Sequence, residues 1–250
     1  MNPTPTASHR AQALVLAAGR GERMRPLTDH TPKPLLKVHG KSLLGWHLDA
    51  LVMSGIGETV INTAWLGEQI PQRFGNQHQH MALHYSMEGR DFGGALETAG
   101  GVVRALPLLQ DVFWLLAGDV YMPGFRFEPL ALQSFAASKF LAHLWLVPNP
   151  VHNPHGDFGL GDDGLALNLG KGLSGERFTY STIGLYRRSF FASPLCPIEP
   201  GNPRGERAAL APMLRQAMDH KMVSAELYTG AWTDVGTPAR LAQLNQTADP

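Results

Sequence analysis

The chain has 250 residues, of which 44% are hydrophobic and 17% are charged, so it is long enough to bury a full hydrophobic core. Lysine plus arginine and aspartate plus glutamate number 21 each. This balance excludes a whole-chain field that would attract nucleic acid, so any affinity for anions must come from a local site. The single cysteine, Cys196, excludes an internal disulfide and a cysteine-rich metal site.

The apolar run at residues 13–18 is shorter than the core of a signal peptide, and charged residues follow it where a cleavage site would need small ones. No apolar run approaches the ~20 residues that are needed to cross a bilayer. We therefore expect a cytoplasmic protein, with a flexible tail at residues 1–10 and a single domain over residues 11–250.

Strand-like and helix-like segments alternate along the first half of the chain. Short apolar runs predict buried strands, and amphipathic stretches that begin at a capping residue or end at glycine predict helices. In order, the expected elements are a strand at 13–18, a helix at 42–55 capped by Ser42, a strand at 59–62, a helix at 68–74 that ends at Gly75, a strand at 82–86, a helix at 98–106 and a strand at 112–117. This alternation is typical of an α/β fold with a doubly wound, mostly parallel, Rossmann-like sheet.

The second half of the chain is less regular. It predicts a helix at 129–138, strands at 140–147 and 180–186, a helix at 208–218, a short strand and turn at 230–236, and a last helix with Thr237 as its cap and Pro238 as its first residue. Residues 148–175 are rich in Asn, Pro, His, Gly and Asp. We expect a small, irregular β insertion there that carries part of a binding surface.

The segment after the first strand combines glycines, cations and prolines. Gly19 and Gly21 would let backbone amides approach phosphate oxygens. However, Met24 stands where a dinucleotide fingerprint needs its third glycine, and no P-loop lysine follows. The cations of this segment are Arg20, Arg23, Arg25, Lys33 and Lys37. They predict either a triphosphate clamp or a solvated basic loop, which the prolines at positions 26, 32 and 34 should keep stiff and free of helix.

Two aspartates lie at positions where a carboxylate could bind a ligand. Asp119 follows the strand at 112–117, and open α/β sheets place ligand crevices at the carboxyl ends of their strands; alternatively, it stabilises a turn. Asp234 precedes the last helix, but Thr237 already serves as the cap, so the Asp234 carboxylate is left for another role. The histidines show no helical pattern of metal ligands.

Several motifs together resemble a known family. The string LAAGRGERMRPLT at residues 16–28, followed by PKPL at 32–35, is similar to the signature of the sugar-1-phosphate nucleotidyltransferases, which make nucleoside-diphosphate sugars. Other segments match the family in the same order, namely ETAGG at 97–101, GDV at 118–120 and WTDVGT at 232–237. The resemblance therefore covers nearly the whole chain.

The resemblance implies a site for each reactant. Asp119 and Asp234 would bind Mg²⁺, Lys33 would lie at the α-phosphate and Arg23 would face the leaving phosphates, and these four are the expected catalytic residues. The expected nucleotide-binding residues are Leu16, Ala18, Gly19, Gly21, Glu22, Arg23, Lys33, Thr98, Gly100 and Gly118. For the sugar we expect Glu97, Asn149 and Asp157, with Lys171 as an open candidate because the Glu-Lys-Pro stretch of many relatives is missing here.

Within the family, residues 60–67 and 149–158 most resemble the branch that transfers a uridylyl group from UTP to N-acetylmuramate 1-phosphate in peptidoglycan recycling. Three alternatives stay open: transfer to mannose 1-phosphate from GTP, transfer to glucose 1-phosphate from UTP or dTTP, and a catalytically silent module that binds nucleotide sugars. The expected partners are thus UTP or another nucleotide and a sugar 1-phosphate, with no nucleic acid or membrane, in a monomer or homodimer.

Overall fold

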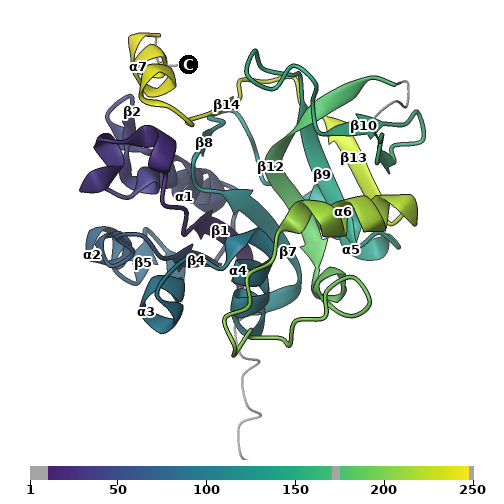
Figure 1. Cartoon of the computed structure of the whole chain (residues 1–250), viewed down its shortest axis with the longest axis horizontal. Helices are drawn as coiled ribbons and strands as arrows, with labels where there is room; N and C mark the ends of the chain where they lie inside the picture. Colours follow the sequence, from purple (N-terminus) through teal and green to yellow (C-terminus); the bar gives the residue numbers. More distant parts are fainter. Residues whose placement is uncertain (1–10, 171–174, 248–250) are drawn as a thin grey trace, which may run out of the picture.

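The computed structural model describes residues 11–170 and 175–247, and a mixed β-sheet forms its centre (Figure 1). From one edge to the other, the sheet contains β11 (Ala166–Leu167), β10 (Phe158–Leu160), β12 (Arg177–Arg187), β7 (Leu109–Ala117), β1 (Ala11–Ala17), β4 (Glu58–Thr63), β6 (Met81–Met87) and β5 (Gln77–His78). Strand β9 (Ala142–Val147) also pairs with β12, and β13 (Val223–Leu227) pairs with β9.

The strands at the centre of the sheet are parallel. β1 lies between β7 and β4, and β6 follows β4, all in the same direction, whereas β12 is antiparallel to β7. Leu14 and Val15 of β1 are fully buried, as an apolar strand that is covered on both faces should be. Because these strands are parallel, their carboxyl ends meet at one edge of the sheet, and ligand crevices form at such edges.

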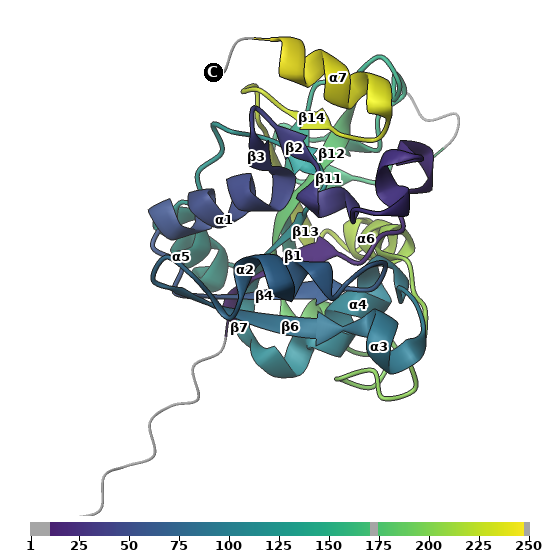
Figure 2. The same ribbon diagram turned by 90° about the vertical axis from the view of Figure 1, so that its left-hand side faces the viewer.

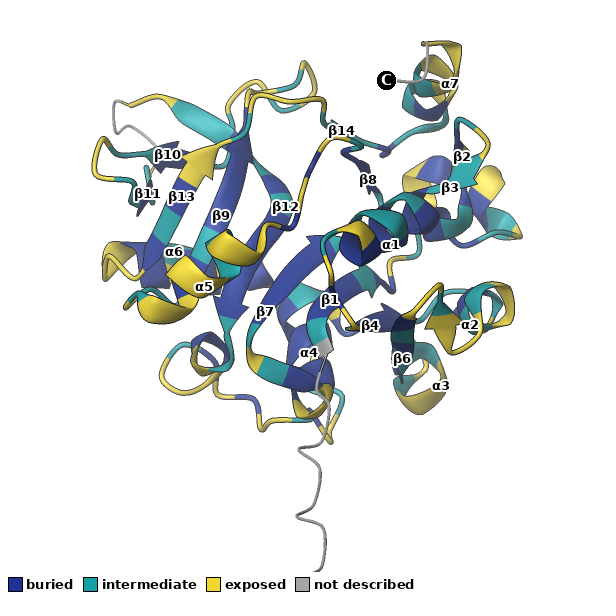
Figure 3. Cartoon of the chain, turned by 180° about the vertical axis from the view of Figure 1, so that it is seen from behind, coloured by how far each residue is buried: buried dark blue, intermediate teal, exposed yellow. Residues whose placement is uncertain are grey.

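Helices cover both faces of the sheet, which confirms the expected doubly wound α/β class. In Figure 2, α1 (Leu43–Met53) and α5 (Pro129–Ala137) lie on one side of the strands, and α4 (Glu97–Ala105) and α6 (Leu210–Asp219) lie on the other. Each side has its own hydrophobic core: one contains side chains of α1, α2 (Gln69–Phe74) and α5, and the other contains side chains of α4 and α6. Figure 3 shows the strands between them as mostly buried.

A smaller layer lies beyond the carboxyl ends of the central strands. It contains the pair β2 (Lys37–Val38) and β3 (Lys41–Ser42), the pair β8 (Val120–Tyr121) and β14 (Thr233–Asp234), and the last helix α7 (Pro238–Gln246). Met24, Val38, Leu43, Tyr121 and Val235 form a third apolar cluster there. This layer brings the glycine-rich segment and the C-terminal part of the chain together.

Two of the expected helix caps are confirmed. The Ser42 hydroxyl accepts a hydrogen bond from the Gly45 amide at 3.1 Å, and the Thr237 hydroxyl accepts one from the Arg240 amide at 3.3 Å. The insertion at 148–175 contains β10 and β11 in its described part. The expected tail at residues 1–10 and Lys171 lie outside the described residues.

The structure also contains elements that the sequence did not predict. β13 and α3 (Glu88–Phe92) were both missed. The proline-rich segment is not free of helix, since it forms short 3-10 turns at Glu22–Met24, Leu27–Asp29 and Lys33–Leu35. Proline can occupy the first turn of a helix, where its missing N–H costs nothing, so prolines prevented only a longer helix. No helix in the described ranges combines the length and the apolar character needed to cross a membrane.

Candidate active site

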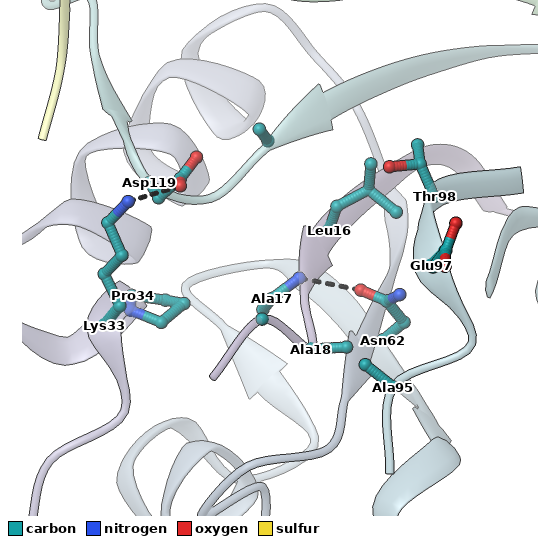
Figure 4. Close-up of a pocket in the computed structure, with 12 residues that line it drawn as sticks. Leu16, Ala17, Ala18, Lys33, Pro34, Asn62, Ala95, Glu97, Thr98 and Asp119 are labelled. Atoms are coloured by element: carbon teal, nitrogen blue, oxygen red, sulfur yellow. Dashed lines mark hydrogen bonds and ion pairs between the residues drawn. The ribbon is translucent and has the colours of Figure 1, made fainter. Parts of the chain in front are cut away.

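A cavity of about 230 Å³ lies at the carboxyl ends of β1 and β7 (Figure 4). Its lining comes from five segments: the end of β1, the proline-rich segment, β4, the start of α4 and the end of β7. The lining residues are Leu16, Ala17, Ala18, Gly19, Lys33, Pro34, Asn62, Ala95, Glu97, Thr98, Ala117 and Asp119. In Figure 4, Lys33 and Asp119 lie on one side of this cavity, and Glu97 and Thr98 lie on the other.

Lys33 and Asp119 form an ion pair at the mouth of the cavity. The Lys33 Nζ lies 2.5 Å from the Asp119 Oδ2, although the two residues are 86 positions apart in the chain. Lys33 is only 8% exposed, so its ammonium group is fixed close to the cavity in a medium where its charge is poorly screened. The arrangement places one cation and one carboxylate where phosphate groups could bind.

A buried network holds the floor of the cavity. The Ala17 amide donates to the Asn62 Oδ1 at 2.7 Å, and the Asn62 Nδ2 donates to the Glu88 Oε1 at 2.7 Å. The Leu96 amide donates to the Glu88 Oε2 at 2.8 Å. Burial raises the pKa of the Glu88 carboxyl above its ordinary value. The network thus ties the end of β1 to the residue that precedes α4.

The two glycines of the ETAGG segment serve this packing. A Cβ at Gly101 would lie 2.6 Å from the Glu88 Oε1, and a Cβ at Gly100 would lie 2.5 Å from the Glu206 carbonyl oxygen. The amides of Ala99 and Gly100 both donate to the Ala208 carbonyl oxygen, at 2.9 and 3.2 Å. These amides are therefore engaged within the protein, and from this segment the first cavity is lined by Glu97 and Thr98.

A second cavity of about 510 Å³ adjoins the first, and Leu16, Glu97, Thr98 and Ala117 line both. The rest of its lining comes from β7, from the insertion, from β12 and from α6. These residues are Leu115, Asp157, Phe158, Tyr180, Thr182, Ala209, Leu210, Ala211, Leu214 and Arg215. The two cavities together form one continuous candidate site.

Thr182 marks the second cavity as a place for a polar ligand. Its backbone has a φ of 70°, a conformation that a β-branched residue rarely adopts. The pairing of β12 with β9 shifts register between Tyr180 and Gly184, around Thr182, and such bulges often lie beside binding sites because they redirect side chains. The Thr182 Oγ1 is buried and has no hydrogen-bond partner among the described residues. A bound hydroxyl or amide would satisfy it.

Asp234 is brought to Asp119 by the pairing of β8 with β14. Asp234 pairs with Val120, and the Val235 amide donates to the Asp119 carbonyl oxygen at 3.0 Å. The carboxylates have different partners, however. Asp234 forms an ion pair with Arg240, and its Oδ1 lies 2.7 Å from the His152 Nε2; these three residues line a separate cavity.

The two aspartates fit a divalent cation in part. Carboxylate oxygens on neighbouring strands are the donors that Mg²⁺ prefers, with phosphate and water oxygens completing the shell. Among the described residues, no three His, Cys, Asp or Glu side chains gather into a group that could hold a metal by themselves. A cation between Asp119 and Asp234 would therefore need the ligands of a bound nucleotide, and it would compete with Lys33 and Arg240 for the carboxylates.

The structure divides the cations of the proline-rich segment into different roles. Arg20 donates to the Thr28 carbonyl oxygen at 2.9 Å and to the Asp29 Oδ1 at 3.1 Å, and its guanidinium lies 3.7 Å from the centre of the Trp65 ring. These contacts give Arg20 a structural role. Arg23 is exposed, and it makes no hydrogen bond or ion pair with the part of the chain that the structure describes.

Of the expected site residues, those that line the two cavities are Leu16, Ala18, Gly19, Lys33, Glu97, Thr98, Asp119 and Asp157. Others lie beside the lining: Gly118 is buried behind β1, and a Cβ at Gly21 would touch Thr28 and Lys33. Glu22 and Asn149 are exposed and outside the lining of both cavities. The Asn149 side chain bonds to the Arg177 carbonyl oxygen and to Thr179, which gives it a role in the shape of the insertion.

Asn62 and Arg215 are site residues that were not predicted. Asn62 lies in the buried part of β4, where its neighbours at positions 59–63 are apolar or carry hydroxyl groups, and a buried amide in such a strand was the signal that could have identified it. Arg215 had no comparable signal, because it lies in an ordinary amphipathic helix.

His47, on α1, supports the strand end that carries Asp119. Its Nε2 lies 2.9 Å from the Val120 carbonyl oxygen, and the residue is 4% exposed. Burial lowers the pKa of His47 to about 4, against the opposing effects of the hydrogen bond to Val120 and the charge of Asp119. The imidazole is therefore neutral at pH 7, and its Nε2–H donates to the carbonyl.

Comparisons with known proteins identify the family of the chain. The family model described as "Nucleotidyl transferase" matches residues 12–249. The chain is 45% identical, over 95% of its own length and 98% of the relative's, to an N-acetylmuramate alpha-1-phosphate uridylyltransferase of Neisseria meningitidis serogroup B. A protein of the same name from Caulobacter vibrioides is 37% identical over 40% of this chain and 41% of its own.

Among solved structures, a putative glucose-1-phosphate thymidylyltransferase from Bacillus anthracis superposes with a TM-score of 0.77 at 19% identity, over 94% of this chain and 93% of that one. This likeness shows the shared fold. The family model covers nearly the whole chain and the meningococcal relative is similar over its full length, so the chain belongs to the nucleotidyl transferase family and is a sugar-1-phosphate nucleotidyltransferase.

Proposed function

We propose that the protein transfers the uridylyl group of UTP to N-acetylmuramate 1-phosphate, releasing pyrophosphate and UDP-N-acetylmuramate. The pair of the buried Lys33 with the partly exposed Asp119, 2.5 Å apart in the lining of a cavity, is the observation that carries nucleotidyl transfer. The choice of substrates rests on the 45% identity to the meningococcal relative of that name. We place the reaction in the cytoplasm, where UTP is available.

The reaction needs no activated side-chain nucleophile. A phosphate monoester has a second pKa near 6, so the sugar phosphate is an anionic nucleophile at neutral pH. Its oxygen attacks the α-phosphorus of UTP, a new P–O bond forms, and the bond to the oxygen between the α- and β-phosphates breaks as pyrophosphate leaves. What the protein must supply is the alignment of two anions and the neutralisation of their charge.

In this proposal, the first cavity holds the nucleotide. Lys33 neutralises charge on the α-phosphate as the transition state forms. Arg23, whose guanidinium is exposed and free of partners in the described chain, is available for the leaving phosphates. Glu97 and Thr98 line both cavities, so they lie where the nucleotide and the sugar would meet. The second cavity, with Asp157 and Thr182, holds the sugar.

Nucleotidyltransferases of this family generally use a divalent metal, and we propose that it is Mg²⁺ and that Asp119 and Asp234 hold it. Bound there, the cation would supply positive charge against the phosphate oxygens and fix their geometry. Lys33 and Arg240 would then move from the carboxylates toward phosphate groups or solvent, because each aspartate now pairs with a cationic side chain.

The experiment that tests this function measures pyrophosphate release with Mg²⁺ over a matrix of substrates. The nucleotides are UTP, GTP, dTTP and CTP, and the sugars are the 1-phosphates of N-acetylmuramate, N-acetylglucosamine, mannose and glucose. We expect the pair UTP and N-acetylmuramate 1-phosphate to give the largest kcat/KM, because the lactyl group of that sugar adds contacts that the other sugars lack. Reactions with EDTA control for metal dependence.

Other outcomes would change the assignment in defined ways. A different dominant pair would keep nucleotidyl transfer and reject the proposed substrates. Folded protein that releases no pyrophosphate with any pair would reject the enzymatic proposal and favour a module that binds nucleotide sugars.

A further inference from the structure

Arg215 is the one cationic side chain among the described residues that line the second cavity. It belongs to α6, which lies across the same face of the sheet as α4 (Figure 1). The hydrogen bonds from the Ala99 and Gly100 amides to the Ala208 carbonyl fix the segment just before α6 beside α4. The position of Arg215 is thereby tied to Thr98, where the two cavities meet.

The Arg215 guanidinium is held in place without being neutralised. Its Nη1 donates to the Asn168 Oδ1 at 2.8 Å, its Nη2 donates to the Asp157 carbonyl oxygen at 3.5 Å, and its Cζ lies 5.1 Å from the centre of the Phe158 ring. These partners are an amide, a backbone carbonyl and an aromatic ring, none of which carries a charge. A guanidinium has five N–H donors, so Arg215 retains both its positive charge and donors for a ligand.

The two acidic residues of the same cavity, Asp157 and Glu97, do not form an ion pair with Arg215. The Asp157 Oδ2 accepts a hydrogen bond from the Tyr180 amide at 2.8 Å, and its Oδ1 accepts a weaker one from the Asn153 side chain at 3.4 Å. Glu97 lies at the junction with the first cavity. The lining thus contains the carboxylates of Glu97 and Asp157 and one fixed, half-buried cation, Arg215, which forms no ion pair with the described residues and can pair with an anionic group of the ligand.

The substrate of the proposed function carries such a group. N-acetylmuramate is N-acetylglucosamine with a lactyl ether on the sugar ring, and the lactyl group ends in a carboxylate. We propose that Arg215 is the specificity-determining residue that binds this carboxylate, an inference that rests on the proposed function. Arginine binds carboxylates through two parallel hydrogen bonds, whereas a sugar without the lactyl group would leave the guanidinium without a counter-charge.

The test compares two substrates that differ only in this charge, N-acetylmuramate 1-phosphate and the same compound with its lactyl carboxylate converted to a carboxamide. The kcat/KM of each is measured with UTP for the wild type, Arg215→Gln and Arg215→Lys. We expect the wild type to prefer the acid by roughly 10- to 100-fold, since hydrogen bonds between charged groups contribute about that much. In Arg215→Gln, the kcat/KM for the acid should fall by this factor, and the kcat/KM for the carboxamide should change by less than about threefold.

Arg215→Lys should keep part of the preference, because it retains the charge but not the paired donors. It also keeps the test decisive if Arg215→Gln does not fold, as judged by circular dichroism and thermal unfolding. The matched control is Arg204→Gln, which removes an exposed arginine before α6 that pairs with Glu206 at 2.6 Å and lines neither cavity. The kcat/KM of this variant should equal that of the wild type with both substrates.

Three outcomes would overturn the inference. Equal kcat/KM values for the two compounds in the wild type would show that the enzyme does not recognise the charge of the lactyl carboxylate. An Arg215→Gln variant that loses the same factor with both compounds shows a purely structural role. A wild type that is inactive with N-acetylmuramate 1-phosphate but active with another sugar phosphate rejects the proposed function and this inference together, whereas the first two outcomes reject only the role of Arg215.

Discussion

The two cavities of the site differ in how the chain builds them. The first, which we assign to the nucleotide, takes much of its lining from one stretch of sequence, since Leu16, Gly19 and Lys33 lie within eighteen consecutive positions. The second, which we assign to the sugar, gathers residues from the insertion, from β12 and from α6, including Asp157, Thr182 and Arg215. A contiguous segment leaves a motif in the sequence, whereas a surface built from distant segments leaves none.

This difference has a physical reason. Phosphate binding needs glycine turns and fixed cations close to the end of a strand, and these requirements act on neighbouring residues. Sugar binding needs hydroxyl, amide and ionic partners that converge on a volume, and any element that borders the volume can supply them. Substitutions should therefore affect catalysis strongly on the first side and substrate choice on the second.

The largest expected effect tests the first side. Lys33→Ala should lower turnover by about 10²-fold or more, because it removes a preorganised charge that stabilises the transition state, while the thermal unfolding midpoint changes little. Turnover is measured by coupled pyrophosphate release. Lys37→Ala, an exposed lysine of the same segment, is the control and should keep wild-type turnover. A loss of less than tenfold in Lys33→Ala would remove this residue from the chemistry.

The next largest effect tests whether Asp234 binds the metal together with Asp119 of the first cavity, although the Asp234 carboxylate contacts His152 and Arg240 in this structure. Asp119→Asn and Asp234→Asn should each lower Mg²⁺-dependent turnover by about 10²-fold, because each removes half of the protein's charge on the cation. A titration with Mg²⁺ measures both the rate and the concentration needed. The exposed Asp162→Asn serves as control. If only Asp119→Asn loses activity, Asp234 is not a metal ligand.

The smallest expected effect concerns His47, which supports the strand end beside the first cavity and takes no part in the chemistry. Since the pKa of His47 falls from 6.5 to about 4 on folding, the unfolded chain binds a proton between these values that the folded chain does not. Stability is therefore lost as the pH falls below 6.5 toward 4. By linkage, the protonation of His47 in the unfolded chain should lower the free energy of unfolding by about 1 kcal/mol between pH 7.5 and pH 5.5.

Urea unfolding of the wild type and of His47→Gln at the two pH values measures this effect. The variant cannot be protonated, so its stability should depend less on pH than that of the wild type. His80→Gln, which changes an exposed histidine, should behave as the wild type does. Equal pH dependence in the wild type and in His47→Gln would show that His47 is not buried in its neutral form.

Most of the fold could be predicted from local patterns. The apolar run that became β1 and the capping residues Ser42 and Thr237 specified their elements because strand burial and helix capping depend on a few neighbouring residues. β13 alternates apolar and polar residues over five positions (VSAEL), so the strand pattern was present in the sequence but was not recognised there. It is a strand because it pairs with β9, a contact far away in the sequence.

By itself, the sequence determined the class of chemistry of this protein. The glycine turn, Lys33, the strand end at Asp119 and the segment around Asp234 are local patterns, and their joint resemblance to the family signature implied phosphate and metal chemistry. Tertiary structure decided which of these groups meet. It paired Lys33 with Asp119, engaged Arg20 with Asp29 and Trp65, and placed Arg215 in the lining of the second cavity. Such pairings depend on how sheets and helices pack around a common volume, and no short stretch of sequence encodes that packing.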